Sequence, residues 1–93
     1  MDLGIKGKTA LVCASSRGLG LACATALARE GANVFINGRT EEALAKAADQ
    51  IEAETGARPT LLVADLNTEA EREEIIKACP EPDILINLSL MHI

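Results

Sequence analysis

The sequence predicts an α/β fold in which a parallel sheet of about four strands is flanked by three helices. Short aliphatic runs alternate along the chain with longer segments of helical periodicity. The runs are continuously apolar, which is typical of strands buried on both faces. Strands that alternate with helices of this length imply right-handed crossovers, and the doubly wound arrangement then places the strands in the order 3-2-1-4.

The four predicted strands cover residues 9–14, 33–37, 60–64 and 83–88. The only aromatic residue of the chain, Phe35, lies in the second of them. Since aromatic side chains usually contribute most to a core and are almost absent here, we expect a core of leucine, isoleucine, valine and alanine.

The first helix is expected over residues 18–30, where Gly31 is a natural C-terminal stop. Small residues on one side of this segment predict a face that packs closely against the sheet. The residues assigned to that face are Ala22, Ala26 and Ala28, beside Leu27.

The second helix is expected over residues 41–54. Thr40 is the predicted N-cap, Glu41 and Glu42 suit the positive end of the helix dipole, and Gly56 ends the helix. Apolar positions at helical spacing predict its buried stripe. The stripe consists of Leu44, Ala47, Ala48 and Ile51.

The third helix is expected to begin after Thr68, because Thr68 and Glu71 have the spacing of a capping box. Pro80 ends it, since proline cannot continue a helix. The apolar residues that carry the pattern onward are Ile75, Ile76 and Cys79.

Composition excludes several function classes. The chain has 93 residues, with 9 Lys and Arg against 14 Asp and Glu, so the net charge is −5. This acidic balance argues against nucleic-acid binding, and no apolar run approaches the length of a membrane span. The amino terminus lacks an apolar signal core, so we expect a cytoplasmic protein. We expect Cys13, Cys23 and Cys79 to be small buried residues, because their spacing matches no metal or redox motif.

The turn after the first strand predicts a phosphate-binding site. It connects a strand to a helix and contains two glycines, which allow a pyrophosphate to approach backbone amides at a helix N-terminus. The alternative is a tight turn in which glycine packs against the sheet. The candidate cofactor-binding residues of this turn are Ser15, Ser16, Arg17, Gly18, Leu19 and Gly20.

The same residues resemble the start of a short-chain dehydrogenase/reductase. The segment Gly-Lys-Thr-Ala-Leu-Val precedes Ser-Ser-Arg-Gly-Leu-Gly, and the family's loop reads Thr-Gly-x-x-x-Gly-x-Gly. Gly18 and Gly20 match that loop, whereas Cys13 stands at its threonine and Ala14 at its first glycine. Alanine fits there if the position has a negative φ. The resemblance covers residues 7–87 and implies a Rossmann-type three-layer fold that binds NAD(P).

Within the family, two segments look most like reductases of the 3-oxoacyl-[acyl-carrier-protein] type. They are Ser15-Ser16-Arg17 and Asn37-Gly38-Arg39. The resemblance therefore implies hydride transfer from a nicotinamide cofactor to a ketone or a 3-oxoacyl thioester, or the reverse oxidation.

The end of the second strand predicts which cofactor is bound. An acidic residue there would favour NAD, but the chain has Asn37 followed by Gly38, Arg39 and Thr40. Arg39 offers a planar fork suited to a phosphate monoester, and Arg17 could reach the same 2′-phosphate. We therefore expect NADP(H) in preference to NAD. The alternative is that Arg39 is a solvated loop charge beside the two glutamates that follow.

Three further cofactor contacts are implied by the resemblance. In the family, an aspartate that matches Asp65 bonds the adenine amino group, and the next backbone amide, that of Leu66, reaches the adenine ring. Asp65 could also cap the turn before Thr68, and the two roles are compatible. Asn87 matches the first residue of the family's Asn-Asn-Ala-Gly segment, which borders the nicotinamide ribose.

Beyond residue 87 the resemblance ends. We interpret residues 1–93 as a single partial NAD(P)-binding domain in which 88–93 form a tail foreign to the family, as a frameshift, a premature stop or an artificially chosen chain boundary would produce. The family's catalytic Tyr, Lys and Ser all lie later, and this sequence contains no Tyr. We therefore assign no catalytic and no metal-binding residue and expect the chain alone to be inactive.

A second hypothesis is a non-catalytic module that senses NADP or pairs with a full-length relative. The fourth strand would present an uncovered aliphatic edge, Ile84-Leu85-Ile86. Such an edge is a template for strand pairing, so self-association or low solubility is expected.

Overall fold

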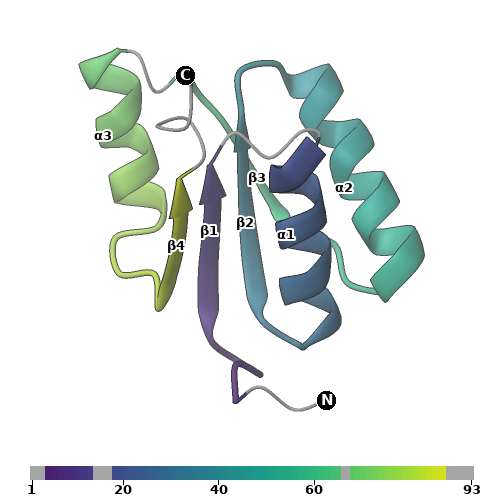
Figure 1. Ribbon diagram of the computed structural model, residues 1–93. Helices are drawn as coiled ribbons and strands as arrows, with labels where there is room; N and C mark the ends of the chain where they lie inside the picture. Colours follow the sequence, from purple (N-terminus) through teal and green to yellow (C-terminus); the bar gives the residue numbers. More distant parts are fainter. Residues whose placement is uncertain (1–3, 14–17, 66–67, 88–93) are drawn as a thin grey trace.

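The computed structural model describes residues 4–13, 18–65 and 68–87. Strands and helices alternate in it as the sequence predicts (Figure 1). The elements are β1 (Thr9–Cys13), α1 (Gly18–Arg29), β2 (Asn33–Gly38), α2 (Glu41–Thr55), β3 (Thr60–Val63), α3 (Glu69–Ala78) and β4 (Ile84–Asn87). These bounds differ from the predicted ones by one or two residues, and Ala14 and Leu88, predicted as strand ends, lie outside the described residues.

The sheet is fully parallel, in the order β3-β2-β1-β4, which confirms the predicted arrangement. Val12 of β1 is paired with Ile36 on one side and with Ile86 on the other. Two hydrogen bonds join the starts of β1 and β4: the Asp83 amide donates to the Thr9 carbonyl, and the Thr9 amide donates to the Asp83 carboxylate. Because all four strands run the same way, their carboxyl ends meet at one edge of the sheet.

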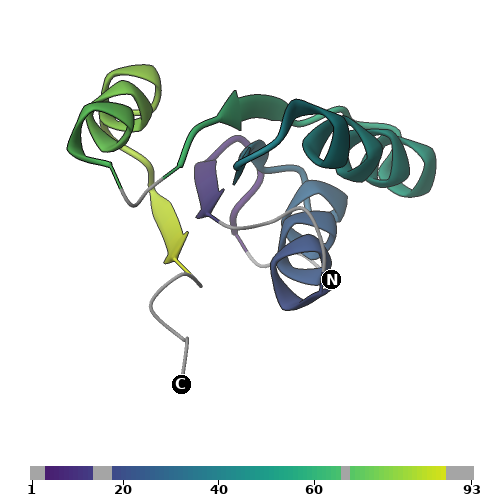
Figure 2. The same cartoon turned by 90° about the horizontal axis from the view of Figure 1, so that it is seen from above.

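The helices cover the two faces of the sheet unequally. Helices α1 and α2 pack side by side on one face, and α3 lies on the other (Figure 2). The larger core, under α1 and α2, is formed by Ala10, Val12, Ala24, Ala28, Ala32, Val34, Ile36, Leu44, Ala47, Ala48 and Ile51. The smaller core, under α3, is formed by Leu11, Cys13, Ala64, Ile75 and Cys79. The core is therefore aliphatic, as expected, and Phe35 lies at its border.

The prediction that all four strands are buried on both faces is wrong for the two outer ones. In β1, four of the five residues are buried, because α1 covers one face and α3 the other. No residue of β3 or β4 is fully buried: Val63 is 47% exposed and Leu85 is 60% exposed. An outer strand has a neighbour on one side only, so its apolar residues reach solvent although the run of residues resembles that of a central strand.

The predicted inner face of α1 is also partly wrong. Ala22 and Ala26 are exposed, whereas Ala28 is buried as expected. The residues that pack against the sheet follow a four-residue spacing from Gly20. They are Gly20, Ala24, Thr25 and Ala28. The hydroxyl of Thr25 donates to the carbonyl of Leu21 at 2.8 Å, so this buried polar group is satisfied within the helix.

Helix α2 buries the four predicted residues of its stripe. It ends at Gly56, whose φ of +81° is the left-handed conformation that glycine adopts without strain. Thr40 occupies the N-cap position with an extended backbone, but its side chain forms no capping hydrogen bond. The predicted N-cap position is therefore confirmed, but the hydrogen bond expected from the Thr40 side chain is not formed.

In α3 the predicted N-terminus is confirmed. The hydroxyl of Thr68 accepts the Glu71 amide at 3.3 Å and donates to Glu71 Oε2 at 2.8 Å. Of the three apolar residues that continue the helical pattern, Ile75 and Cys79 are buried, whereas Ile76 is 61% exposed. Adjacent helical residues diverge by about 100°, so a single narrow contact with the sheet accommodates only one of the two isoleucines.

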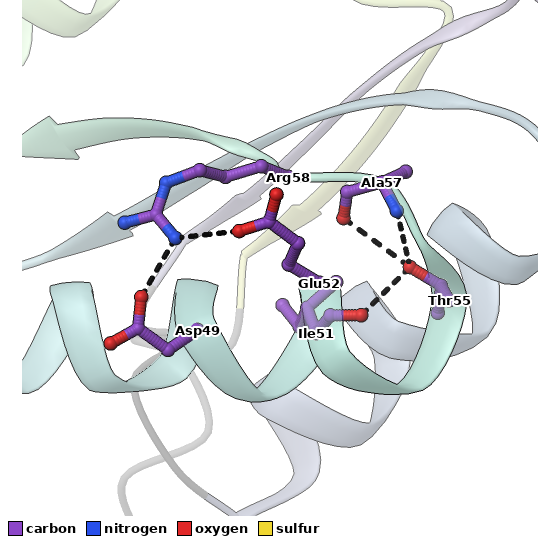
Figure 3. Close-up of polar contacts among 6 residues, drawn as sticks. All are labelled: Asp49, Ile51, Glu52, Thr55, Ala57 and Arg58. Carbon is purple, nitrogen blue, oxygen red and sulfur yellow. Dashed lines mark hydrogen bonds and ion pairs between the residues drawn. The ribbon is translucent and has the colours of Figure 1, made fainter.

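At the amino-terminal end of the sheet, the connection from α2 to β3 forms hydrogen bonds and ion pairs with side chains of α2 (Figure 3). Arg58 Nη1 contacts Asp49 Oδ1 at 2.7 Å and Glu52 Oε1 at 3.1 Å. These hydrogen bonds, first that to Asp49, raise the pKa of the Arg58 guanidinium. Thr55 Oγ1 donates to the Ile51 carbonyl at 2.7 Å and accepts the Ala57 amide at 3.1 Å. This polar cluster is structural, because it lies away from the carboxyl edge.

Candidate functional site

In the sheet, β2 and β3 lie on one side of β1. The last strand, β4, lies on the other side of β1. Such a reversal of strand order opens a crevice at the carboxyl ends of the two strands, and this is where ligands bind in sheets of this type. Cys13 is paired there with Asn87, although the two residues are 74 positions apart in the sequence. The topology thus places those candidate residues that the structure describes after the strand ends at one edge of the sheet.

The amino terminus of α1 is suited to an anion. Gly18 has a φ of +64° and nothing lies within 4 Å of the position of a Cβ on it, while Gly20 is buried in the helix packing. The first turn of α1 contains no acidic residue, whereas α2 and α3 each begin with two glutamates. The partial positive charge of α1 is therefore not neutralised by carboxylates of its own first turn. Leu19 is 61% exposed, and Ser15, Ser16 and Arg17 lie outside the described residues.

Arg39 follows the last residue of β2 and is exposed. Within residues 4–13, 18–65 and 68–87 it forms no ion pair, including with the two glutamates that begin α2. Next to it, Thr40, Glu42, Ala43 and Lys46 line a shallow cavity of about 310 Å³. The lining of this cavity includes one cation, Lys46, and one anion, Glu42.

Asn37 has a different role from the one that the sequence suggested. The sequence indicated a residue at the end of the second strand that is not acidic and that belongs to a segment resembling the family, whereas in the structure Asn37 is 2% exposed and lies within the sheet. Its Nδ2 donates to the Leu62 carbonyl at 2.9 Å and to the Ala64 carbonyl at 3.1 Å. Asn37 therefore joins the ends of β2 and β3. A polar residue inside an otherwise apolar strand was the available signal.

Asp65 follows the end of β3 and is half-buried. Its amide donates to Glu71 Oε1 at 3.0 Å, and its carbonyl accepts the Thr68 amide at 3.1 Å. The turn before α3 is thus closed by the backbone of Asp65. Glu71, which the sequence analysis considered only as part of a helix cap, also reaches back to this residue. Leu66, the neighbouring candidate, lies outside the described residues.

Asn87 ends β4 beside Cys13 and is exposed. The Cys13 thiol is buried, and its pKa is raised by burial and by the nearby Cys79, so Cys13 is unsuited to act as a nucleophile. Cys79 is buried as expected, whereas Cys23 is only partly so, and all three are free thiols. In the part of the chain that the structure describes, no three His, Cys, Asp or Glu side chains are grouped as metal ligands, and no helix has the length and apolarity to cross a membrane.

Comparisons with known proteins agree with this geometry. Residues 8–88 match a family model described as short chain dehydrogenase. The uncharacterised oxidoreductase YvaG of Bacillus subtilis is 44% identical over 88 residues, which cover 94% of this chain and 33% of that protein. The D-beta-hydroxybutyrate dehydrogenase of Cupriavidus necator is 39% identical over 87 residues, which cover 89% of this chain and 33% of that protein.

A solved structure has the same arrangement of elements. The L-sorbose reductase of Gluconobacter frateurii, in complex with NADPH and L-sorbose, matches with a TM-score of 0.76 and 35% identity. The match covers 91% of this chain and 34% of that protein. The chain therefore spans about a third of the length of the relatives it matches.

Proposed function

Because the chain belongs to the short-chain dehydrogenase family, we propose that it forms the NADP(H)-binding portion of an oxidoreductase. The reaction of the whole protein would be hydride transfer between NADPH and a ketone or 3-oxoacyl thioester. The observation that carries the choice of cofactor is Arg39, an exposed guanidinium that forms no ion pair with the described residues and follows the carboxyl end of β2, whose last two residues, Asn37 and Gly38, are not acidic.

The pyrophosphate of the cofactor would lie on the first turn of α1. Amides of Gly18, Leu19 and Gly20 would donate to it, with Ser15, Ser16 and Arg17 of the preceding turn contributing further donors. The open space around Gly18 favours this position, because a Cβ there would project into the region that the phosphates need. The acid-free first turn of α1 adds a favourable dipole.

The 2′-phosphate of the adenosine ribose would be held by Arg39 and Thr40, with Arg17 in reach. A guanidinium can donate two parallel hydrogen bonds to a phosphate, and the double negative charge of a monoester strengthens both. In NAD-dependent enzymes an acidic side chain at this point would accept hydrogen bonds from the ribose hydroxyls. Here β2 ends in Asn37 and Gly38, and the Asn37 side chain donates to the carbonyls of Leu62 and Ala64.

At the two ends of the dinucleotide, Asp65 and the Leu66 amide would bind the adenine, and Asn87 would border the nicotinamide ribose. When bound, NADPH supplies the hydride, and these residues supply binding and orientation. The 93-residue sequence has no Tyr that could act as the general acid. We propose that this portion binds cofactor and that the acid–base residues belong to other parts of a complete reductase.

The cofactor preference can be tested by reversing one charge. Arg39→Asp should lower the ratio of NADPH to NADH affinity by about tenfold or more, which is the value of one hydrogen bond to a charged group. Arg29→Asp is the matched control, since Arg29 has the same charge and is exposed at the other end of α1, where it pairs with Glu54. An unchanged ratio in Arg39→Asp, measured by quenching of the reduced cofactor's fluorescence or by calorimetry, would refute the assignment.

A second candidate function is pairing through β4, with another copy or with a full-length relative. Its favouring observation is that β4 pairs with β1 along one edge while Leu85 is 60% exposed. Sedimentation of the chain alone and mixed with a full-length reductase should show association that Leu85→Lys abolishes. Ile76→Lys, at an equally exposed apolar residue on α3, should leave association intact. A monomer that never joins the reductase would exclude this function.

A further inference from the structure

The peptide group between Ala64 and Asp65 is held from both sides by side chains of other elements. Its carbonyl, that of Ala64, accepts Nδ2 of Asn37 at 3.1 Å. Its amide, that of Asp65, donates to Oε1 of Glu71 at 3.0 Å. One side chain comes from the end of β2 and the other from the first turn of α3. Together they fix the orientation of the peptide plane.

The neighbouring backbone groups are fixed as well. The Ala64 amide donates to the Gly38 carbonyl at 2.9 Å, and the Asp65 carbonyl accepts the Thr68 amide at 3.1 Å. All four main-chain polar groups of these two residues are therefore satisfied within the protein. Their backbone is left with little freedom to rotate, and the direction in which the Asp65 side chain leaves it is set by these bonds.

The peptide group needs a hydrogen-bond donor at its carbonyl and an acceptor at its amide, and Asn37 and Glu71 supply one of each. Asn37 is 2% exposed and faces two carbonyl oxygens, so it must be a donor. A carboxylate of the same shape would oppose both oxygens without a proton between them, which is costly in a buried position. Glu71 must be an acceptor, since it faces an amide at one oxygen and the Thr68 hydroxyl at the other.

We propose that Asn37 and Glu71 are positioning residues that orient Asp65 for recognition of the adenine amino group. This inference rests on the proposed function, in which Asp65 binds the adenine. It adds that base recognition depends on two residues that do not touch the cofactor. One of them, Asn37, lies in the strand that also leads to the phosphate-binding Arg39.

The experiment compares two probes, adenosine 2′-monophosphate and inosine 2′-monophosphate, on the 93-residue chain. The inosine base carries an oxygen in place of the amino group and a proton on the adjacent ring nitrogen, so the affinity ratio reports the contacts of Asp65 and of the Leu66 amide with the base edge and cancels the phosphate contacts. The wild-type chain should prefer the adenosine probe. Asn37→Asp and Glu71→Ala should each lower the ratio about tenfold, as expected for loss of a hydrogen bond to a charged group. Glu71→Gln, which keeps an acceptor oxygen, should restore it.

Two control variants separate orientation from charge. Asn33→Asp makes the same change at the opposite end of β2, and Glu74→Ala removes an exposed glutamate one turn further along α3. Both should keep the wild-type ratio. A substitution that only destabilises the fold would lower the affinity for both probes equally and leave their affinity ratio unchanged. If Asn37→Asp does not fold, the Glu71 variants decide.

The outcomes distinguish the inference from the function on which it rests. A wild-type chain that binds neither probe, or binds both equally, refutes the proposed role of Asp65 and with it this inference. A wild-type preference that survives in Glu71→Ala refutes only the positioning role. As a ligand-free check, hydrogen exchange of the Asp65 amide should accelerate in Glu71→Ala and remain unchanged in Glu74→Ala. Equal exchange rates would also overturn the inference.

Discussion

The core packing can be tested by making the same isoleucine-to-alanine substitution on each of two helices. Ile51 of α2 is 0% exposed, whereas Ile76 of α3 is 61% exposed. Replacing either by alanine removes three carbon atoms. At Ile51 the lost transfer free energy is about 2.4 kcal/mol, and the cavity left in a close-packed core raises the expected loss to about 3–4 kcal/mol.

At Ile76 most of the side chain is already in water, so the transfer loss is about 1 kcal/mol. Alanine recovers a few tenths of a kcal/mol through its higher helix propensity. We therefore expect a loss of less than about 1 kcal/mol there. A domain of this size has a total stability of about 5–14 kcal/mol, so only Ile51→Ala should shift the unfolding midpoint strongly.

Urea unfolding followed by circular dichroism measures both losses in free energy of unfolding. Equal losses in the two variants, or a loss below about 1 kcal/mol for Ile51→Ala, would refute the core described under α2. The slope of the transition should be the same in both variants, because neither changes the area exposed on unfolding substantially.

Four further outcomes are expected. Gly18→Ala should destabilise the chain in urea by about 1–2 kcal/mol from its positive φ alone, since nothing lies near the new Cβ; a much larger loss would indicate a clash instead. The raised pKa of the buried Cys13 thiol should make it react with iodoacetamide more slowly than Cys23, as mass spectrometry would show. For the same reason the free energy of unfolding should fall as pH rises through and above the ordinary thiol pKa, because the unfolded thiol ionises first, and Cys13→Ala should reduce this fall. Arg58→Ala should destabilise the chain slightly at low salt and not at high salt, and a loss that persists at high salt would argue against exposed ion pairs.

Features that depend on neighbouring residues were predictable. Helix α2 has charged residues on its outer side and an apolar stripe that includes the large side chains of Leu44 and Ile51, so the position of the stripe can be predicted from the sequence. The spacing of Thr68 and Glu71 predicted a cap that the structure confirms. The sheet order followed from the alternation of strands and helices together with the right-handed crossover.

Features that depend on contacts distant in the sequence were not predictable. In α1 eight of the twelve residues are Gly, Ala, Cys or Thr, so size and polarity differ too little among them to predict which alanines face the sheet. Asn37 bonds a carbonyl 27 residues away, and Glu71 reaches back past its own helix to Asp65. The exposure of Leu85 agrees with the uncovered edge predicted for the fourth strand, whereas the prediction that the outer strands are buried on both faces came from their local apolar runs alone and was wrong.

The central claim is that this carboxyl edge binds NADP(H) through the 2′-phosphate. Calorimetric titration of the wild-type chain with NADPH and with NADH, in the same buffer, tests it most directly. The account predicts that NADPH binds more tightly by about tenfold or more, the value of a charge-assisted contact to Arg39. Equal affinity for the two cofactors, or tighter binding of NADH, would contradict it.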